Sequence, residues 1–195
     1  MKLAIVSDFV EEGWPSMDLV ADELLRAAAE LPGVEVGRVR PTMLGPFSKL
    51  APRHAASYVV RNADRFSGRY LEYSLRVLGE RRRYDRFHVV DHSYAHLALL
   101  LPAGRIGVFC HDTDAFAPLF EPHAPRWRKA LAGMLLSGMR RADVVFYSTG
   151  SVRESIVRQA LVPEEILVHA PYGVAREFQP ASTAEDAFER AADAE

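Results

Sequence analysis

Short apolar runs rich in β-branched residues alternate along this chain with longer segments in which apolar residues recur every three or four positions. This alternation is typical of βαβ units, in which helices cover both faces of a parallel sheet. The pattern therefore predicts an α/β fold with a doubly wound, mostly parallel, Rossmann-like sheet. The expected strands lie at about residues 2–7, 34–40, 86–91, 106–110, 143–148 and 166–169.

The segment between the first two expected strands has the period of an amphipathic helix. Its apolar positions are Met17, Val20, Ala21, Leu24, Ala28 and Leu31. Pro15 and Ser16 supply a start signal, with Ser16 as the expected N-cap. Pro32 and Gly33 supply the stop signal, since neither continues a helix well.

Three further helical segments are predicted downstream. Residues 53–83 predict two helices separated near Ser67-Gly68, a connection much longer than a simple crossover needs. Residues 125–141 predict another amphipathic helix. A Ser-x-x-Glu capping box that begins at Ser151 predicts a helix over residues 152–160.

Composition fixes the broad class of protein. The 195 residues suffice for one substantial domain, and 49% hydrophobic beside 26% charged residues is ordinary for a folded soluble protein. We expect one domain over residues 1–180 and an acidic linker or tail over 181–195. A net charge of −2 argues against nucleic-acid binding. The single Cys110 and the lack of a signal peptide or spanning run predict a cytoplasmic protein.

Candidate chemistry follows from the fold class, because ligands of open parallel sheets bind outside the carboxyl ends of the strands. The residues expected there are Asp8, Gly13, Trp14, Asp91, His92, Ser93, Tyr94, His111, Asp112, Ser148, Tyr172 and Gly173. His111 is the preferred catalytic candidate, because it ends an apolar strand and precedes a polar, acidic loop. Asp112 is the residue expected to orient it or to bind hydroxyl groups.

Each of these residues also has a purely structural alternative. Asp8 could merely cap the turn after the first strand. Gly13 could supply a tight turn that lets backbone N–H groups approach a phosphate at the first helix, but a lone glycine does not make a phosphate-binding motif. His92 and His96 are four residues apart and could join His111 and Asp112 in a metal site. No recognised metal-binding motif supports that arrangement, so no metal is expected.

Arginine is concentrated in the predicted helices of residues 53–83 and 125–141. Basic amphipathic helices of this kind can dock on anionic lipid, so peripheral contact with the inner membrane face is an alternative for this chain. Acidic residues interrupt the charge, which favours an ordinary solvated surface instead. These residues are Asp64, Glu72, Glu80 and Asp85.

The second half of the chain resembles the end of the N-terminal domain of family 4 glycosyltransferases, which have the GT-B fold. The resemblance begins with Ala142-Asp143 and a strand that ends in Ser148, then a helix, and then a strand that closes in Tyr172-Gly173-Val174 and Phe178-Gln179-Pro180. Asp91-His92-Ser93-Tyr94-Ala95 and the strand that ends in His111-Asp112 are also similar to that family. The likeness covers about residues 1–180.

This resemblance implies that the chain is the acceptor-side half of a retaining glycosyltransferase. Its partners would be a nucleotide-sugar donor as co-substrate, a sugar or lipid-linked acceptor, and a C-terminal donor-binding domain in cis or in trans, with no other cofactor. Carried over by position, Gly13 would lie near the donor diphosphate, and His111 would contact the transferred sugar. Hydrogen-bond donors and a positioned acceptor hydroxyl would then supply the catalysis.

The sequence departs from the family in its first loop, where Glu11-Glu12-Gly13 has a single glycine beside two acids, and at Ala175, where the family has aspartate. The donor-binding half is also missing from these 195 residues, so we expect the chain alone to be inactive or weakly active. Two other functions stay open at this point. One is a non-catalytic acceptor- or partner-binding module, and the other is a small metal-dependent hydrolase.

Overall fold

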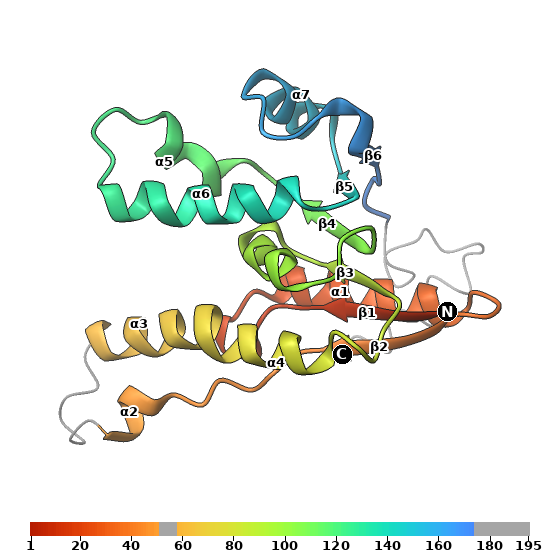
Figure 1. The fold of residues 1–195 in the computed structure, drawn as a ribbon, viewed down its shortest axis with the longest axis horizontal. Helices are drawn as coiled ribbons and strands as arrows, with labels where there is room; N and C mark the ends of the chain where they lie inside the picture. Colours follow the sequence, from red (N-terminus) through yellow and green to blue (C-terminus); the bar gives the residue numbers. More distant parts are fainter. Residues whose placement is uncertain (51–57, 174–195) are drawn as a thin grey trace, which may run out of the picture.

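The computed structural model describes residues 1–50 and 58–173 and places six parallel strands in one sheet (Figure 1). Their order is β2-β1-β3-β4-β5-β6. The predicted doubly wound α/β sheet is therefore confirmed, and each predicted strand boundary lies within two residues of the observed one. The strands are β1 (Lys2–Val6), β2 (Glu35–Val39), β3 (Arg86–Val89), β4 (Ile106–Cys110), β5 (Val144–Tyr147) and β6 (Leu167–His169).

Helices and helical turns connect the strands. The expected tail over residues 181–195 lies outside the described residues, as do residues 174–180. In chain order the connecting elements are η1 (Val10–Glu12), α1 (Pro15–Ala29), α2 (Pro46–Leu50), α3 (Tyr58–Ser67), η2 (Gly68–Glu72), α4 (Tyr73–Glu80), η3 (His92–Leu100), η4 (Asp114–Phe116), α5 (Ala117–Phe120), α6 (Arg126–Arg140), α7 (Gly150–Arg158) and η5 (Glu164–Ile166).

The helices cover the two faces of the sheet unequally. Against one face packs α1, whose Ala21 is buried among Ile5 and Val90. The other face carries the main core, to which α4, η3, α6 and α7 contribute buried side chains such as Tyr73 and Ile156. This distribution follows from the strand order, because β1 reaches β2 in one direction and every later connection runs the other way.

Two predicted helix starts were wrong. Helix α1 begins at Pro15, so Ser16 lies inside the first turn and Trp14 occupies the N-cap position without a side-chain hydrogen bond. Proline has no N–H and a preset φ, which suits the first helical position. Helix α7 begins at Gly150, because Thr149 rather than Ser151 is its N-cap and accepts a hydrogen bond from the Val152 N–H at 3.3 Å.

The long connection between β2 and β3 forms an arm beside the sheet (Figure 1). The predicted separation of two helices near Ser67-Gly68 was wrong, because α3 continues through the π-helical segment η2 into α4 without leaving the helical conformation. A Cβ on Gly68 would lie 3.1 Å from Met43 Cγ, so the glycine lets the preceding loop pack closely against the helix. Helix α2 was not predicted, because five residues are too few for a helical period to show.

The tightest packing in the core joins α6 to η3. A Cβ on Gly138 would lie only 1.9 Å from the carbonyl oxygen of Ala95, so glycine alone lets the two backbones approach this closely. The 125–141 prediction is confirmed by α6, and the remainder of that helix presents Leu135 and Met139 to the core.

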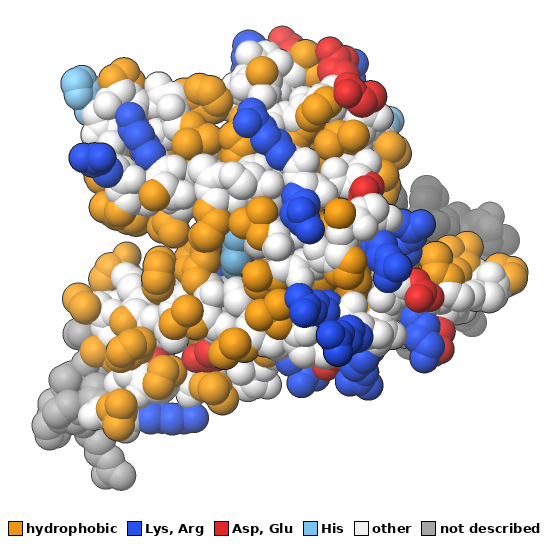
Figure 2. All heavy atoms as spheres, viewed as in Figure 1, with side chains coloured by type: hydrophobic (Ala, Val, Ile, Leu, Met, Phe, Trp, Pro, Cys, Tyr) orange, Lys and Arg blue, Asp and Glu red, His pale blue; other side chains and the backbone are white. Residues whose placement is uncertain are grey.

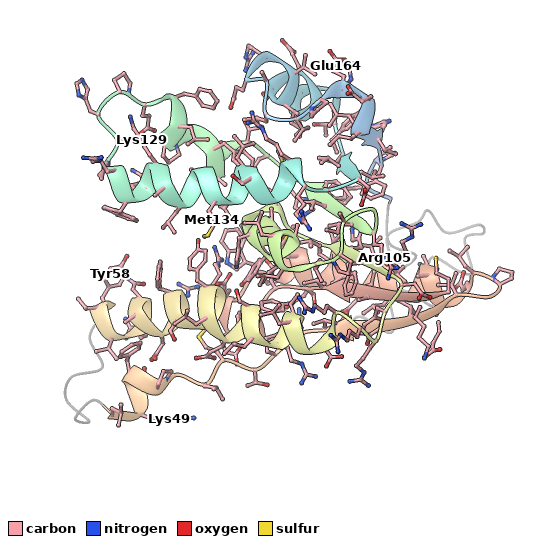
Figure 3. The ribbon with its side chains drawn as sticks, viewed as in Figure 1. Lys49, Tyr58, Arg105, Lys129, Met134 and Glu164 are labelled. Carbon is pink, nitrogen blue, oxygen red and sulfur yellow. The ribbon has the colours of Figure 1, made fainter. Side chains whose placement is uncertain are left out.

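The carboxyl ends of the strands open into a notch between α3 and α6. Figure 2 shows apolar side chains on both lips of this notch and a histidine at its base. Figure 3 shows Tyr58 of α3 and Met134 of α6 on the two sides of the gap. Trp127, at the start of α6, is 65% exposed, and Phe66 on α3 is 53% exposed. Within residues 1–50 and 58–173, none of the helices combines the length and the hydropathy that a membrane crossing requires.

Candidate functional site

Three neighbouring strands bring polar side chains together at the carboxyl edge of the sheet. Asp8 follows β1, Asp91 and His92 follow β3, and His111 and Asp112 follow β4. Because β1, β3 and β4 are adjacent in the sheet, these five residues, which we call the carboxyl-edge cluster, lie around one point. The order of strands reverses between β1 and β3, so the cluster occupies the position where ligands bind in folds of this class.

Two carboxyl groups of the cluster are buried side by side, and their pKa values are shifted in opposite directions. Asp8 is 3% exposed, and desolvation, followed by the charges of Asp91 and Glu12, raises its pKa to about 8. Burial also disfavours the charge of Asp91, but His92 and Ser93 outweigh it and lower the Asp91 pKa below its usual range. Asp8 is therefore protonated at neutral pH and Asp91 ionised, an arrangement suited to proton donation beside a fixed negative charge.

Ser93 and His92 fix the ionised carboxylate of Asp91. The Ser93 backbone N–H donates to Oδ1 at 2.9 Å, and the Ser93 hydroxyl donates to Oδ2 at 2.6 Å. The Asp91 side chain thereby forms the N-cap of η3. The carboxylate is oriented by the start of this helix and needs no ligand to hold it in place.

His92 lies between two carboxylates. Its Nδ1 is 3.1 Å from Asp91 Oδ1, and its Nε2 is 3.4 Å from Asp112 Oδ1. Desolvation lowers the pKa of this buried ring, but the hydrogen bonds and charges of the two aspartates prevail and raise the pKa to about 9. His92 is therefore an imidazolium at neutral pH, and it joins the carboxyl ends of β3 and β4 electrostatically.

His111 is in the opposite protonation state. Its Nε2–H donates to the Val90 carbonyl at 2.7 Å, so its Nδ1 accepts a hydrogen bond from the Tyr172 hydroxyl. Desolvation lowers the pKa of His111, which keeps the ring neutral. The ring stacks on Phe109 with a centroid distance of 4.5 Å. A neutral, oriented imidazole of this kind can accept a proton or a hydrogen bond at Nδ1.

A buried ion pair borders the cluster and was missed by the sequence analysis. Arg69 donates to both carboxylate oxygens of Glu12, with Nε 3.2 Å from Oε1, and its guanidinium lies 4.6 Å above the ring of Tyr94. Tyr94 is buried beneath this pair. Arg69 belongs to the π-helical segment η2, and π-helical segments are frequent at functional sites.

The loop after β1 makes a tight turn at Gly13. Gly13 adopts φ +68° and closes the turn of η1, with its N–H donating to the Val10 carbonyl at 3.0 Å. The tight turn expected at Gly13 is therefore present, and its left-handed conformation favours glycine there. Trp14 follows it and is 53% exposed. The acid of this loop that reaches the site is Glu12.

The residues expected after β5 and β6 occupy different positions. Tyr172 reaches the cluster through its hydroxyl contact with His111. Ser148 is buried, and its carbonyl is 3.2 Å from His169 Nε2. Gly173 lines an apolar cavity of about 660 Å³ between α1 and the end of the described chain, on the other side of Phe109. Gly173 is therefore beside the cluster rather than in it.

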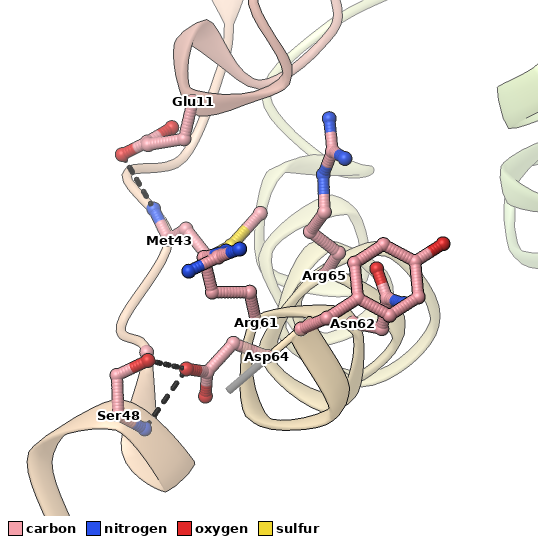
Figure 4. Close-up of a pocket in the computed structure, with 9 residues that line it drawn as sticks. Glu11, Met43, Ser48, Arg61, Asn62, Asp64 and Arg65 are labelled. Carbon is pink, nitrogen blue, oxygen red and sulfur yellow. Dashed lines mark hydrogen bonds between the residues drawn. The ribbon is translucent and has the colours of Figure 1, made fainter. Parts of the chain in front are cut away.

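A second cavity of about 520 Å³ lies between α2, α3 and the loop after β1 (Figure 4). The two acids that line it are already engaged by backbone N–H groups. Glu11 accepts from Met43 at 3.2 Å, and Asp64 accepts from Phe47 and Ser48 at the start of α2 at 2.8 and 2.9 Å. These two acids therefore hold the arm in shape. Arg65 also lines the cavity, and its guanidinium donates to the Glu12 carbonyl at 3.1 Å.

Of the four residues of the hydrolase alternative, His92, His111 and Asp112 lie together in the cluster, whereas His96 does not join them. His96 turns its Nε2 to the Arg69 carbonyl at 3.0 Å, and burial lowers the pKa of its ring to about 4. In the 3-10 helix η3, with about three residues per turn, positions 92 and 96 point in different directions. Among the described residues, no group of three or more His, Cys, Asp or Glu side chains is arranged to hold a metal ion.

Searches against protein-family models and against curated proteins found no match to this chain. Function is therefore inferred from the side chains at the carboxyl edge themselves.

Proposed function

We propose that this chain is the acceptor-side domain of a retaining GT-B glycosyltransferase and that its carboxyl-edge cluster binds a sugar. The observation that carries the proposal is the set of contrasting partners at one point. They comprise a protonated carboxyl at Asp8, an ionised one at Asp91, an imidazolium at His92 and a neutral imidazole at His111.

This set suits a polyhydroxylated ligand. Each sugar hydroxyl is both a donor and an acceptor, so a site that recognises several of them needs donors and acceptors at fixed positions. The cluster offers both kinds. Asp112, whose side chain is 55% exposed, is the most exposed member of the cluster. The aromatic residues beside the notch provide apolar surface for the C–H face of a sugar ring.

Within this proposal His111 positions the sugar at the reacting carbon. Its Nδ1 becomes available to a ligand hydroxyl when Tyr172, which is 51% exposed, turns away. A nucleotide-sugar donor would be the co-substrate, bound by a second domain across the notch. Neutral and charged hydrogen-bond partners would then stabilise the charge that develops during front-face transfer.

Binding by the chain itself provides the first test. Saturation-transfer NMR with a panel of hexoses, inositols and disaccharides should detect at least one ligand. His111→Ala and Asp112→Asn should abolish the signal, and His123→Ala, an exposed histidine in the loop before α6, should leave it unchanged. If none of the panel binds, or if the His123 variant loses binding equally, the sugar site is wrong.

Turnover provides the second test. When a donor-binding domain is supplied, His111→Ala should lower the rate of nucleotide release by about tenfold or more. An unchanged rate would remove His111 from the reaction. Sugar binding without any turnover would instead support the non-catalytic acceptor-binding module.

A further inference from the structure

The opposite edge of the sheet, where the strands begin, carries a basic cavity of about 660 Å³. Four arginines from three separate segments line it. Arg81 and Arg82 precede β3, Arg105 precedes β4, and Arg141 precedes β5. We call this the amino-edge cavity. Figure 2 shows basic side chains gathered to the right of centre, over the region in which Figure 3 labels Arg105.

The two acids nearest these arginines in the sequence, Glu80 and Asp85, have other partners. Glu80 is buried and bound by Arg76 and Arg83, each at 3.0 Å. Asp85 lines the cavity, but its Oδ2 accepts a hydrogen bond from the Lys2 backbone N–H at 2.7 Å. Glu80 is therefore neutralised by other arginines, and Asp85 is the acid that remains at the cavity wall, where the Lys2 backbone holds it.

The arginines are left with unused donors. Arg81, Arg82 and Arg105 are exposed, and their guanidinium groups form no hydrogen bond or ion pair with the described residues. Arg141 is held by the carbonyls of Ala98 and Leu101, with Nε 3.1 Å from the Ala98 oxygen, which fixes its guanidinium at the cavity wall. One anchored and three available guanidinium groups thus surround one concave space.

We propose that the amino-edge cavity binds a ligand that carries more than one phosphoryl group. The planar guanidinium fork matches the oxygens of a phosphoryl group in bidentate fashion, and several arginines around one cavity favour a multiply charged anion over a single carboxylate. The cavity lies at the end of the sheet opposite the carboxyl-edge cluster, so this site is independent of sugar transfer. The same chemistry is offered by a soluble compound with several phosphoryl groups or by several phospholipid headgroups side by side on a membrane surface.

Isothermal titration with tripolyphosphate at low ionic strength tests this proposal on the whole chain. Wild type should bind with saturation, and Arg81→Gln/Arg82→Gln/Arg105→Gln should weaken the binding by about tenfold or more, since it removes three charge-assisted partners. The matched control is Arg126→Gln/Arg128→Gln/Lys129→Gln, which removes three positive charges from the start of α6 and should bind like wild type. Circular dichroism melting confirms that both variants fold.

Sedimentation with phosphatidylglycerol vesicles separates the two sources of the ligand. Binding of tripolyphosphate without sedimentation supports a soluble ligand, and sedimentation that the cavity variant loses and the α6 variant retains supports a lipid headgroup. The proposal is overturned if wild type binds neither probe, or if the two triple variants lose binding to the same extent.

Discussion

Charged side chains gather at both ends of the sheet, but those at the carboxyl edge are mostly buried and paired, whereas most of those at the amino edge are exposed and unpaired within the described part of the chain. At the carboxyl edge, Asp8, Asp91 and His92 are at most 8% exposed, and the charged members are paired at hydrogen-bond distance. At the amino edge, Arg81, Arg82 and Arg105 are exposed and make no pairs with the described residues. Burial forces charged groups to find partners, whereas water satisfies exposed ones.

This difference determines what each end can do. The buried cluster is preorganised, so its protonation states are set before any ligand arrives and suit precise recognition or chemistry. The exposed arginines are adaptable and screened by salt, so they suit electrostatic capture of an anion. The helix η3 connects the two regions, since His92 begins it at one edge and Leu100 ends it beside the amino-edge cavity.

The largest expected effect comes from disturbing η3, because this helix holds both regions. Gly138→Ala places a methyl group against the Ala95 carbonyl of η3, and we expect it to lower the free energy of unfolding by about 3 kcal/mol. Gly133→Ala is the control, since Gly133 lies on α6 as Gly138 does but its Cβ would be an acceptable 4.0 Å from Leu119 Cδ2. The control should gain about 0.5–1 kcal/mol from lower backbone entropy. Urea unfolding of both variants provides the measurement, and similar values for the two would contradict the close contact.

The next largest effect tests the ion pair between Arg69 and Glu12, in which the carboxylate is buried and the guanidinium is partly exposed. Arg69→Met leaves the carboxylate of Glu12 buried without its partner. We expect the free energy of unfolding to fall by about 2 kcal/mol, which is less than for a fully buried pair because Arg69 itself is partly exposed. Glu12→Gln/Arg69→Met should recover most of this loss, since it removes the unpaired charge. The double variant unfolding as readily as Arg69→Met in urea would show that the ion pair is not the cause.

The buried cluster should also make stability depend on pH. The pKa of Asp8 is raised to about 8, so the folded state holds this proton where an unfolded aspartate, with a pKa of about 3.9, has lost it. The contribution is therefore complete below about pH 4 and is lost as the pH rises through about 8. His92 acts in the same direction at higher pH, between its unfolded pKa of about 6.5 and its folded pKa of about 9.

Asp8→Asn should remove the first of these contributions. Between pH 5 and 7 the unfolding free energy of wild type should fall relative to that of the variant by about 1 kcal/mol per pH unit. Denaturant unfolding at pH 5, 6 and 7 provides the comparison. Parallel pH profiles would mean that Asp8 is ionised in the folded protein, and the contrast between Asp8 and Asp91 would then be lost.

The fold could be predicted well from the sequence because each strand has a clear local pattern. Each is a short apolar run bounded by polar residues, and the parallel arrangement then brings the strand ends together. Asp8, His92 and His111 were placed at one edge for this reason alone. The N-caps at Ser16 and Ser151 were wrong, because Pro15 and Thr149 offered competing signals only one or two residues away.

What the sequence could not predict depends on contacts between distant segments. Glu12 and Arg69 are 57 positions apart, and their pairing follows from how the arm packs on the first loop. His92 and His111 differ in protonation because the His92 ring contacts two carboxylates, whereas the His111 ring donates to a backbone carbonyl. The basic cavity was hidden for a related reason, since the sequence shows acids among the arginines and not which partners those acids take.

The smallest expected effect is at the amino edge. Arg81→Gln/Arg82→Gln/Arg105→Gln should change the free energy of unfolding by less than about 0.5 kcal/mol, because these side chains are exposed and have no partner to lose. At low salt the variant should be slightly more stable than wild type, since it relieves repulsion among like charges, and the difference should vanish as salt is added. Urea unfolding at two salt concentrations measures both effects. A loss comparable with that of Arg69→Met would mean that the arginines support the fold rather than stand ready for a ligand, and the contrast between the two edges would fail.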